Sequence, residues 1–480
     1  MNEQDICYAP VVTLAQWIRQ KTASPSEVVQ AFLNRIAKYN PVLNAYCTVA
    51  AEQALQAARE AEQTIMKGGD LPPLLGVPVA IKDLVLTKGI RTTFGSHVYA
   101  DYIPDHDSAV VSRLKEAGAI ILGKTNTPEF GYTGITDNLL FGRTNNPWDL
   151  ARTSGGSSGG SAVAVAAGLA PAAEGNDGGG SIRIPASCCG VYGLKPSFGR
   201  IPFDTARTNF SAVVPFLHEG FLTHSVEDAA LLLTSTQGPH SRDPFSVPIS
   251  RESYYPVERM DMSNVRIAYC PDLDFFPLDP EVKRATDRAV QTLEGLGAQV
   301  ELVSLGFTNY QEEVSNPFAG MWTANLGAHY AELLPIWEPR MSKGLVATIK
   351  AGQNSSVVEY KQLERARSKA YRKVEAILTN YDLLVTPTLA VTAFPHAPGP
   401  TEIDGHLIDP YSGWMLTPLF NLTGHPVASI NCGYSEQGLP IGLQLVGPRY
   451  REEIVLQISK RYQEAAPEHF LRPDLEKRLG

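Results

Sequence analysis

The chain has 480 residues, of which 44% are hydrophobic, and its formal net charge at pH 7 is −9. This length allows one large domain or two to three smaller ones. The charged residues form no basic block, which argues against nucleic-acid binding. The six cysteines are scattered without a Cys-x-x-Cys pair, so we expect reduced thiols, no zinc site and no disulfide scaffold.

The N-terminal sequence MNEQDICYAP is acidic and lacks an apolar run, so we expect no signal peptide. No stretch contains the about 18 apolar residues that a transmembrane helix requires. These features predict a cytoplasmic protein that does not bind membranes.

The first segment, about 11–67, shows the pattern of amphipathic helices. Residues 24–27 read Ser-Pro-Ser-Glu, which is typical of a helix start with a capping serine and a proline in the first turn. We expect this helix to end at Asn40-Pro41 and a second helix to cover residues 52–66. Their role is predicted to be structural packing.

A short apolar run at residues 77–81 predicts a buried strand that ends at Lys82. Lysine is usually exposed, but burial would lower the pKa of this amine and make it a base near neutral pH. Further along, we expect a helix at 108–117 and a strand at 119–123. The polar loop at 124–130 then follows a strand end, where ligands bind in α/β sheets.

Two glycine-serine clusters, residues 155–160 and 178–181, flank an apolar run at 162–167. Such clusters are often flexible linkers, but the apolar run is typical of a buried helix. Free N–H groups in a glycine-rich turn bind negative charge. A serine at the end of the turn, here Ser181, can attack a carbonyl whose oxygen the turn then holds.

These motifs resemble the amidase signature family, whose members hydrolyse or transfer amide nitrogen with a Ser–Ser–Lys triad. The resemblance covers about residues 14–465 and is carried by segments 76–83, 155–161, 179–183, 189–196, 420–426 and 438–447. It implies that Ser181 is the nucleophile, that Ser157 is the bridging serine after a cis peptide bond, and that Lys82 is the base. It also implies a single domain over residues 1–480, an α/β/α sandwich around a large mixed β-sheet with a signature core at about 74–235.

We expect neutral Lys82 to take a proton from Ser157 while Ser157 takes one from Ser181. The backbone N–H groups expected to hold the oxyanion are those of Gly178, Gly179, Gly180 and Ser181. Supporting residues are expected to be Ser158, Asp177 and Arg183, and by resemblance the chain near Gly131 borders the substrate. Asn176 stands where many relatives carry a small or hydroxyl residue. No metal or cofactor is expected.

The later part of the chain predicts alternating helices and strands. Helices are expected at 223–233, 280–296 and 357–378, and strands at 265–269, 299–303 and 381–388. The section at about 305–420 varies in the family, so we expect it to select the substrate. Its aromatic residues between 306 and 356 follow no repeat, and most are expected in the core. His224 is expected to be structural.

Two other interpretations fit parts of the glycine-rich sequence. Residues 155–159 match Gly-x-Ser-x-Gly, the nucleophile elbow of α/β hydrolases. That elbow must follow a strand, and residues 149–153 do not look like one; it also needs a catalytic histidine. A phosphate-binding loop would require Gly-Lys-Ser/Thr after the glycines, which is absent.

The family also contains the glutaminase component of the tRNA-dependent glutamine amidotransferase, which passes ammonia to a partner protein. This chain differs from that component at residues 176–180 and 221–224, where it is more similar to free-standing bacterial amidases. The expected substrate is a small amide or carbamate, and the expected assembly is a monomer or homodimer.

Overall fold

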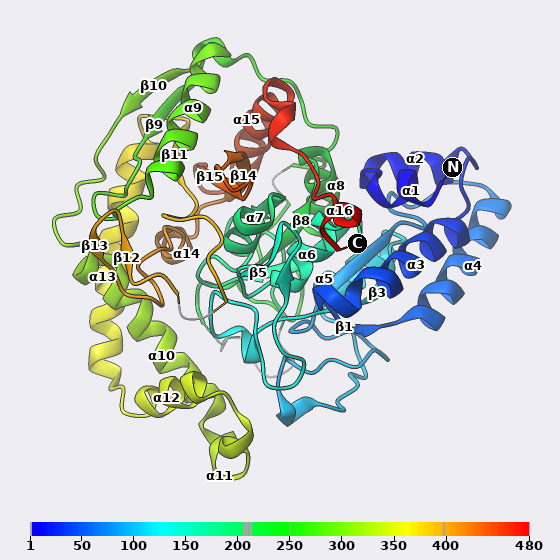
Figure 1. Ribbon diagram of the computed structural model, residues 1–480, viewed down its shortest axis with the longest axis horizontal. Coiled ribbons are helices and arrows are strands. Elements are labelled where there is room, and N and C mark those ends of the chain that lie inside the picture. The colour runs from blue at the N-terminus through cyan, green and yellow to red at the C-terminus, as the bar shows by residue number, and fades with distance from the viewer. Residues whose placement is uncertain (1, 205–209, 211–213, 250, 397–398, 480) are drawn as a thin grey trace.

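The fold is built around a large mixed β-sheet. A computed structural model describes residues 2–204, 210, 214–249, 251–396 and 399–479, and the sheet contains eleven strands within these ranges (Figure 1). In spatial order they are β1 (Tyr46–Val49), β3 (Ile120–Thr125), β2 (Pro78–Lys82), β6 (Ala172–Asp177), β8 (His218–Thr223), β7 (Tyr192–Lys195), β14 (Val427–Tyr434), β15 (Pro440–Val446), β11 (Leu383–Pro387), β9 (Arg266–Tyr269) and β10 (Gln299–Leu302).

The sheet is parallel at both sides and antiparallel in the middle. Strands β3, β2 and β6 run parallel to one another, as do β11, β9 and β10. The strands between β6 and β11 pair in antiparallel fashion, and β1 adds an antiparallel edge. This arrangement confirms the predicted α/β fold with a large mixed sheet. It also brings the carboxyl ends of β2 and β6 to the same edge, where α/β folds bind ligands.

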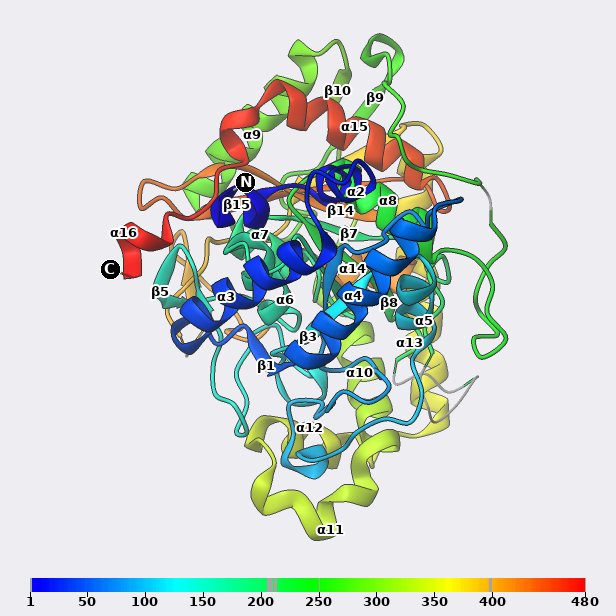
Figure 2. The ribbon, with the colours of Figure 1, turned by 90° about the vertical axis from the view of Figure 1, so that its right-hand side faces the viewer.

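Helices flank the sheet in the views of Figures 1 and 2. They are α1 (Glu3–Tyr8), α2 (Val11–Arg19), α3 (Pro25–Leu43), α4 (Ala51–Lys67), α5 (Ala109–Glu116), α6 (Gly159–Ala166), α7 (Arg183–Cys189), α8 (Val226–Thr236), α9 (Pro280–Gly295), α10 (Asn316–Tyr330), α11 (Leu334–Trp337), α12 (Lys343–Gly352), α13 (Val357–Leu378), α14 (Pro418–Thr423), α15 (Glu452–Ala465) and α16 (Leu475–Leu479). None of the helices in the described part of the chain is long and apolar enough to span a membrane.

Helix α6 forms the centre of the core beneath the sheet. All eight of its residues are buried, as its continuous apolar sequence predicted. It packs against β2, β6 and β8 and contacts α7. The linker interpretation of the glycine-serine clusters is therefore wrong, because both clusters lead into buried helices.

The N-terminal helices follow the prediction except at one end. Ser24 and Glu27 form a reciprocal capping box at the start of α3, as the sequence predicted. The predicted end at Asn40-Pro41 is wrong, because α3 continues to Leu43 with Pro41 in its last turn. Proline has a φ that suits a helix and removes only one hydrogen bond there.

One strand was not predicted, and one predicted helix start is wrong. Residues 149–153 form a strand, β5 (Asp149–Thr153), which pairs with β4 (Asn145–Asn146) in a separate two-stranded sheet. Polar residues suit this strand because its side chains alternate between exposed and partly buried positions. Helix α8 begins at Val226 rather than 223, because Ser225 caps it and Thr223 belongs to β8.

Helices α10 to α12 project beyond the sheet in both views (Figures 1 and 2). They have a small core of their own, which includes Leu326, Leu345 and Ile349. The aromatic residues of this section are only partly in the core. Phe307 and Tyr310 are buried, as expected, whereas the aromatic side chains of α10 border a cavity described below.

Candidate active site

Lys82 ends strand β2 at the edge of the sheet where β6 also ends. Its side chain is fully buried, and its Nζ lies 2.7 Å from Ser157 Oγ and 2.8 Å from Asn176 Oδ1. Burial lowers the pKa of Lys82 to about 7, against the opposing effect of the Glu174 carboxylate. A lysine with such a pKa is a usable base near neutral pH. The parallel pairing of β2 with β6 brings Asn176 to this amine.

Ser157 lies just before α6, and the Gly156–Ser157 peptide bond is cis, as the family resemblance implied. The neighbouring Ser158 joins the two glycine-serine clusters. Its N–H donates to the carbonyl oxygen of Ser181 at 3.1 Å, and its Oγ donates to the carbonyl oxygen of Asn176 at 3.4 Å. Residues that lie far apart in the sequence therefore meet beside Lys82.

The turn between β6 and α7 is built around Asp177. Its carboxylate accepts the N–H of Gly180 at 2.7 Å and that of Ile182 at 3.2 Å. The Arg183 guanidinium donates two bonds of 3.0 Å to the same carboxylate, and both side chains are fully buried. Burial raises the pKa of Asp177, but Arg183 outweighs burial and holds that pKa below its usual range. The charged pair fixes the shape of the turn.

The expectation that Gly180 offers its N–H to an oxyanion is wrong, because this N–H already donates to Asp177. Within the described residues, the N–H groups of Gly178, Gly179 and Ser181 have no hydrogen-bond acceptor. These three donors remain for an anionic ligand. The sequence could not separate them, because the four residues differ only in how Asp177 folds back on the turn.

Residues from the C-terminal part brace this turn, and no role was predicted for them. Arg183 also donates to the carbonyl oxygen of Thr417 at 3.0 Å and to Gln444 Oε1 at 2.7 Å. Asn421 Nδ2 donates to Asp177, and Thr417 Oγ1 donates to the carbonyl oxygen of Gly179. Asn421 and Gln444 belong to the segments 420–426 and 438–447 that carried the family resemblance, which was the one available signal.

A cavity of about 520 Å³ opens over Ser181. Gly131 and Gly179 also line it, and a Cβ placed on Gly131 would lie 3.3 Å from Ser157 Oγ. The predicted site residues of the two clusters, of β2 and of the Gly131 loop therefore surround one space. The lining contains no histidine among the described residues, and the α/β-hydrolase interpretation has no histidine to use there.

Aromatic side chains of α10 form the opposite wall of this cavity. The rings of Phe318 and Trp322 are stacked, with centroids 5.7 Å apart. Both rings lie against the glycine turn: a Cβ on Gly179 would lie 2.6 Å from Phe318 Cζ, and one on Gly178 would lie 2.8 Å from Trp322 Cζ3. Glycine at these positions therefore allows the rings to approach the backbone.

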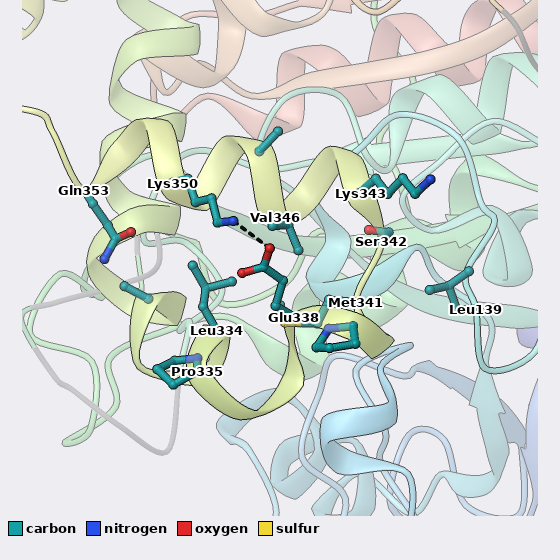
Figure 3. A pocket seen from close by; sticks show the side chains of 13 residues that line it. Leu139, Leu334, Pro335, Glu338, Met341, Ser342, Lys343, Val346, Lys350 and Gln353 are labelled. Carbon is teal, nitrogen blue, oxygen red and sulfur yellow. Dashed lines mark hydrogen bonds and ion pairs between the residues drawn. The ribbon is translucent and has the colours of Figure 1, made fainter.

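A wider hollow of about 1120 Å³ lies between α11 and α12 (Figure 3). Its charged residues Glu338 and Lys350 bind each other at 2.6 Å across the hollow. Lys82, Ser157 and Ser181 do not line it. Although it is larger, it offers no arranged nucleophile and base, so the smaller cavity is the candidate active site.

Two other groups of chemically active side chains lie outside this cavity. The backbone oxygen of His224 accepts a bond from Gln463 of α15, which agrees with a structural role. Cys270, Asp272 and Asp274 have ligand atoms within 4.8 Å of one another. The two carboxylates accept backbone N–H groups of their own and a neighbouring loop, so this cluster is explained by local structure.

Comparisons with known proteins agree with this geometry. The amidase family model matches residues 27–456. An acylamidase of Rhodococcus erythropolis is 35% identical over 472 residues, covering 97% of both chains. The glutaminase component (the "A" chain) of the glutamyl-tRNA(Gln) amidotransferase of Cyanothece sp. is 36% identical over 489 residues, covering 97% of this chain and all of its own.

Solved structures give the same result. A bacterial aryl acylamidase of the amidase signature family has a TM-score of 0.92 at 32% identity, with 97% of this chain and 98% of that chain covered. A 6-aminohexanoate cyclic dimer hydrolase, solved with its substrate, has a TM-score of 0.88 at 30% identity, with 98% and 99% covered. Together with the fold and the arrangement around Lys82, these matches show that the chain belongs to the amidase signature family.

Proposed function

We propose that this amidase-family hydrolase cleaves the C–N bond of neutral carboxylic amides through an acyl-enzyme on Ser181. The observation that carries the proposal is the buried contact of 2.7 Å between Lys82 Nζ and Ser157 Oγ, at the base of the cavity that Ser181 lines. An amide carbonyl is a poor electrophile, so the reaction needs an activated nucleophile, an oxyanion site and a proton for the leaving nitrogen.

In the first step, neutral Lys82 accepts the hydroxyl proton of Ser157, and Ser157 accepts the hydroxyl proton of Ser181. The Ser181 Oγ then forms a bond to the carbonyl carbon, and the carbonyl oxygen becomes an oxyanion. The pKa of Lys82 at about 7 supports this role, since much of the lysine is neutral at neutral pH. Asn176 Oδ1, at 2.8 Å from Nζ, orients the amine toward Ser157.

In the second step, the oxyanion is held by the free N–H groups of Gly178, Gly179 and Ser181. Removal of one such donor typically costs about 10²–10³ in rate. As the C–N bond breaks, Ser157 returns a proton to the leaving nitrogen and the amine departs. Water then attacks the Ser181 ester through the same relay and releases the carboxylic acid.

The proposed substrate is a neutral amide with a flat or apolar group, including anilides. The stacked rings of Phe318 and Trp322 support this choice, because an apolar surface next to the oxyanion site favours such groups. Both rings come from the section 305–420 that was expected to select the substrate. Carbamates present the same carbonyl to Ser181 and belong in the same test.

The experiment is a hydrolysis panel on the purified chain alone, with acyl p-nitroanilides, matched carbamates and glutamine. The expected result is turnover of an anilide or carbamate that both Ser181→Ala and Lys82→Met abolish. Lys350→Met, in the wider hollow, is the control and should keep the wild-type rate. Activity that survives Ser181→Ala would overturn the nucleophile assignment.

The amidotransferase alternative remains part of this test, because the corresponding chains of that enzyme are as similar in sequence as the acylamidase. We expect the chain to act without a partner. Glutamine turnover that appears only after a partner protein is added would assign the chain to the amidotransferase class instead.

A further inference from the structure

A buried pair of carboxyl groups lies on the side of Lys82 away from the substrate cavity. Glu174 belongs to β6 and Glu219 to β8, and both are almost completely buried. In the antiparallel register Asn176 faces Glu219, so Glu174, Asn176 and Glu219 share one face of the sheet. Lys82 binds Asn176 on that face. None of the roles described above uses the two glutamates.

The contacts of the pair identify a place for one proton. Glu174 Oε2 accepts the backbone N–H of Lys82 at 2.9 Å. The two carboxyl groups are also in hydrogen-bond contact with each other. Within the described residues, Glu174 Oε1 and Glu219 Oε2 have no donor. Two buried carboxyl groups in contact cannot both be ionised, and a shared proton removes the conflict.

The surroundings indicate which group holds the proton. Burial, and then the adjacent Glu174, raise the pKa of Glu219 well above its usual value. Burial also raises the pKa of Glu174, but Lys82 and Lys124 act in the opposite direction and its carboxylate accepts the Lys82 N–H. A protonated Glu219 that donates to an ionised Glu174 satisfies both contacts.

The other charges that face this group are neutralised nearby. Asp177 is paired with Arg183, and Asp204, which faces Glu219, is paired with Arg242 at 2.9 Å. Lys124 of β3 faces Glu174 and is buried beside Asp83, which raises its pKa against the larger effect of burial. Among the described residues, the glutamate pair is therefore the acidic group near Lys82 whose charge no arginine balances.

We propose that Glu219 and Glu174 form a carboxyl–carboxylate pair whose single negative charge stabilises protonated Lys82 during turnover and sets the pH range in which Lys82 works. Glu174 and Glu219 are positioning residues, since neither touches the reacting atoms. This inference rests on the proposed roles of Lys82 and Ser181. Without the charge, burial would act alone on Lys82 and the lysine would lose its proton at lower pH.

The test follows the labelling of Ser181 by phenylmethanesulfonyl fluoride, measured by intact mass as a rate against pH. The rate should rise with pH as Lys82 loses its proton. Glu174→Gln, which can still accept the Lys82 N–H, should move this rise to lower pH by about 1 unit. Glu219→Gln should leave it in place, because the amide donates to Glu174 and one negative charge remains. Glu436→Gln, at an exposed acid, is the charge control.

The outcomes separate the inference from the proposed function. Label that persists in Ser181→Ala would contradict the proposed function itself. With Ser181 labelling established, an unmoved rise in Glu174→Gln, or an equal shift in Glu219→Gln, would overturn the shared-proton pair. If Glu174→Gln does not fold, infrared difference spectra at neutral pH decide. A protonated carboxyl band must then be present in wild type and lost in Glu219→Gln; its absence from wild type would overturn the inference.

Discussion

Replacing Arg183 by methionine tests whether the buried ion pair shapes the glycine turn. Methionine has a similar length but leaves the Asp177 carboxylate without its guanidinium partner. The change also removes the donors to the Thr417 carbonyl, to Gln444 and to Asn421. Loss of one partner of a fully buried pair costs about 3–5 kcal/mol, so we expect a decrease of that size in the free energy of unfolding at pH 7.

The decrease should depend on pH in a defined direction. In wild type the pKa of Asp177 lies below its unfolded value of about 3.9, so the pair stabilises the fold above that pH and loses this effect in acid. In the variant, burial remains without Arg183 and raises the pKa of Asp177. The folded variant must then hold a proton that the unfolded chain releases at neutral pH. The difference between the two proteins should therefore shrink as the pH falls from 7 toward 3.

The measurement is urea unfolding followed by tryptophan fluorescence at several pH values between 7 and 4. Arg284→Met is the control, because Arg284 forms only an exposed pair with Glu436 at 3.9 Å, worth about 0–1 kcal/mol. A loss in Arg183→Met below about 1 kcal/mol, or one that does not change with pH, would refute the reasoning about Asp177.

Three further predictions concern activity. The kcat/KM for an anilide should rise with pH through about 7, because Lys82 must lose its proton to act as a base, and a pH profile measures this. Gly180→Ala should cost at least about 10²-fold in kcat, since φ is +123° there and a Cβ would lie 2.1 Å from Thr417 Oγ1; stopped assays on folded variant test it. Trp322→Ala should raise KM for aromatic amides more than for acetamide, which a substrate comparison would show.

Much of the fold could be predicted because its signals are local. The capping box of Ser24 and Glu27, the apolar strand before Lys82 and the apolar run of α6 each lie within a few residues. The errors came where distant partners decide the structure. Strand β5 was missed because its polar residues are ordered by pairing with β4, not by an apolar pattern of their own.

The site could be predicted only in part. Motifs pointed to Lys82, Ser157 and Ser181, and the structure brings these residues to one edge of the sheet. Asn421 reaches Asp177 across 244 positions of sequence, and Glu219 approaches Glu174 only through strand register. No local pattern marks such contacts, since they depend on how strands from distant segments are ordered in the sheet.

The end of β6 links the two halves of the site because neighbouring residues of a strand face opposite sides. Asn176 faces Lys82 and contacts its Nζ, whereas Asp177 faces α7 and holds the turn through Arg183. A change on one face should therefore alter the base while the oxyanion turn keeps its shape, and the reverse should hold for the other face. The base and the oxyanion turn can thus be tested separately, although their supports are adjacent residues of one strand.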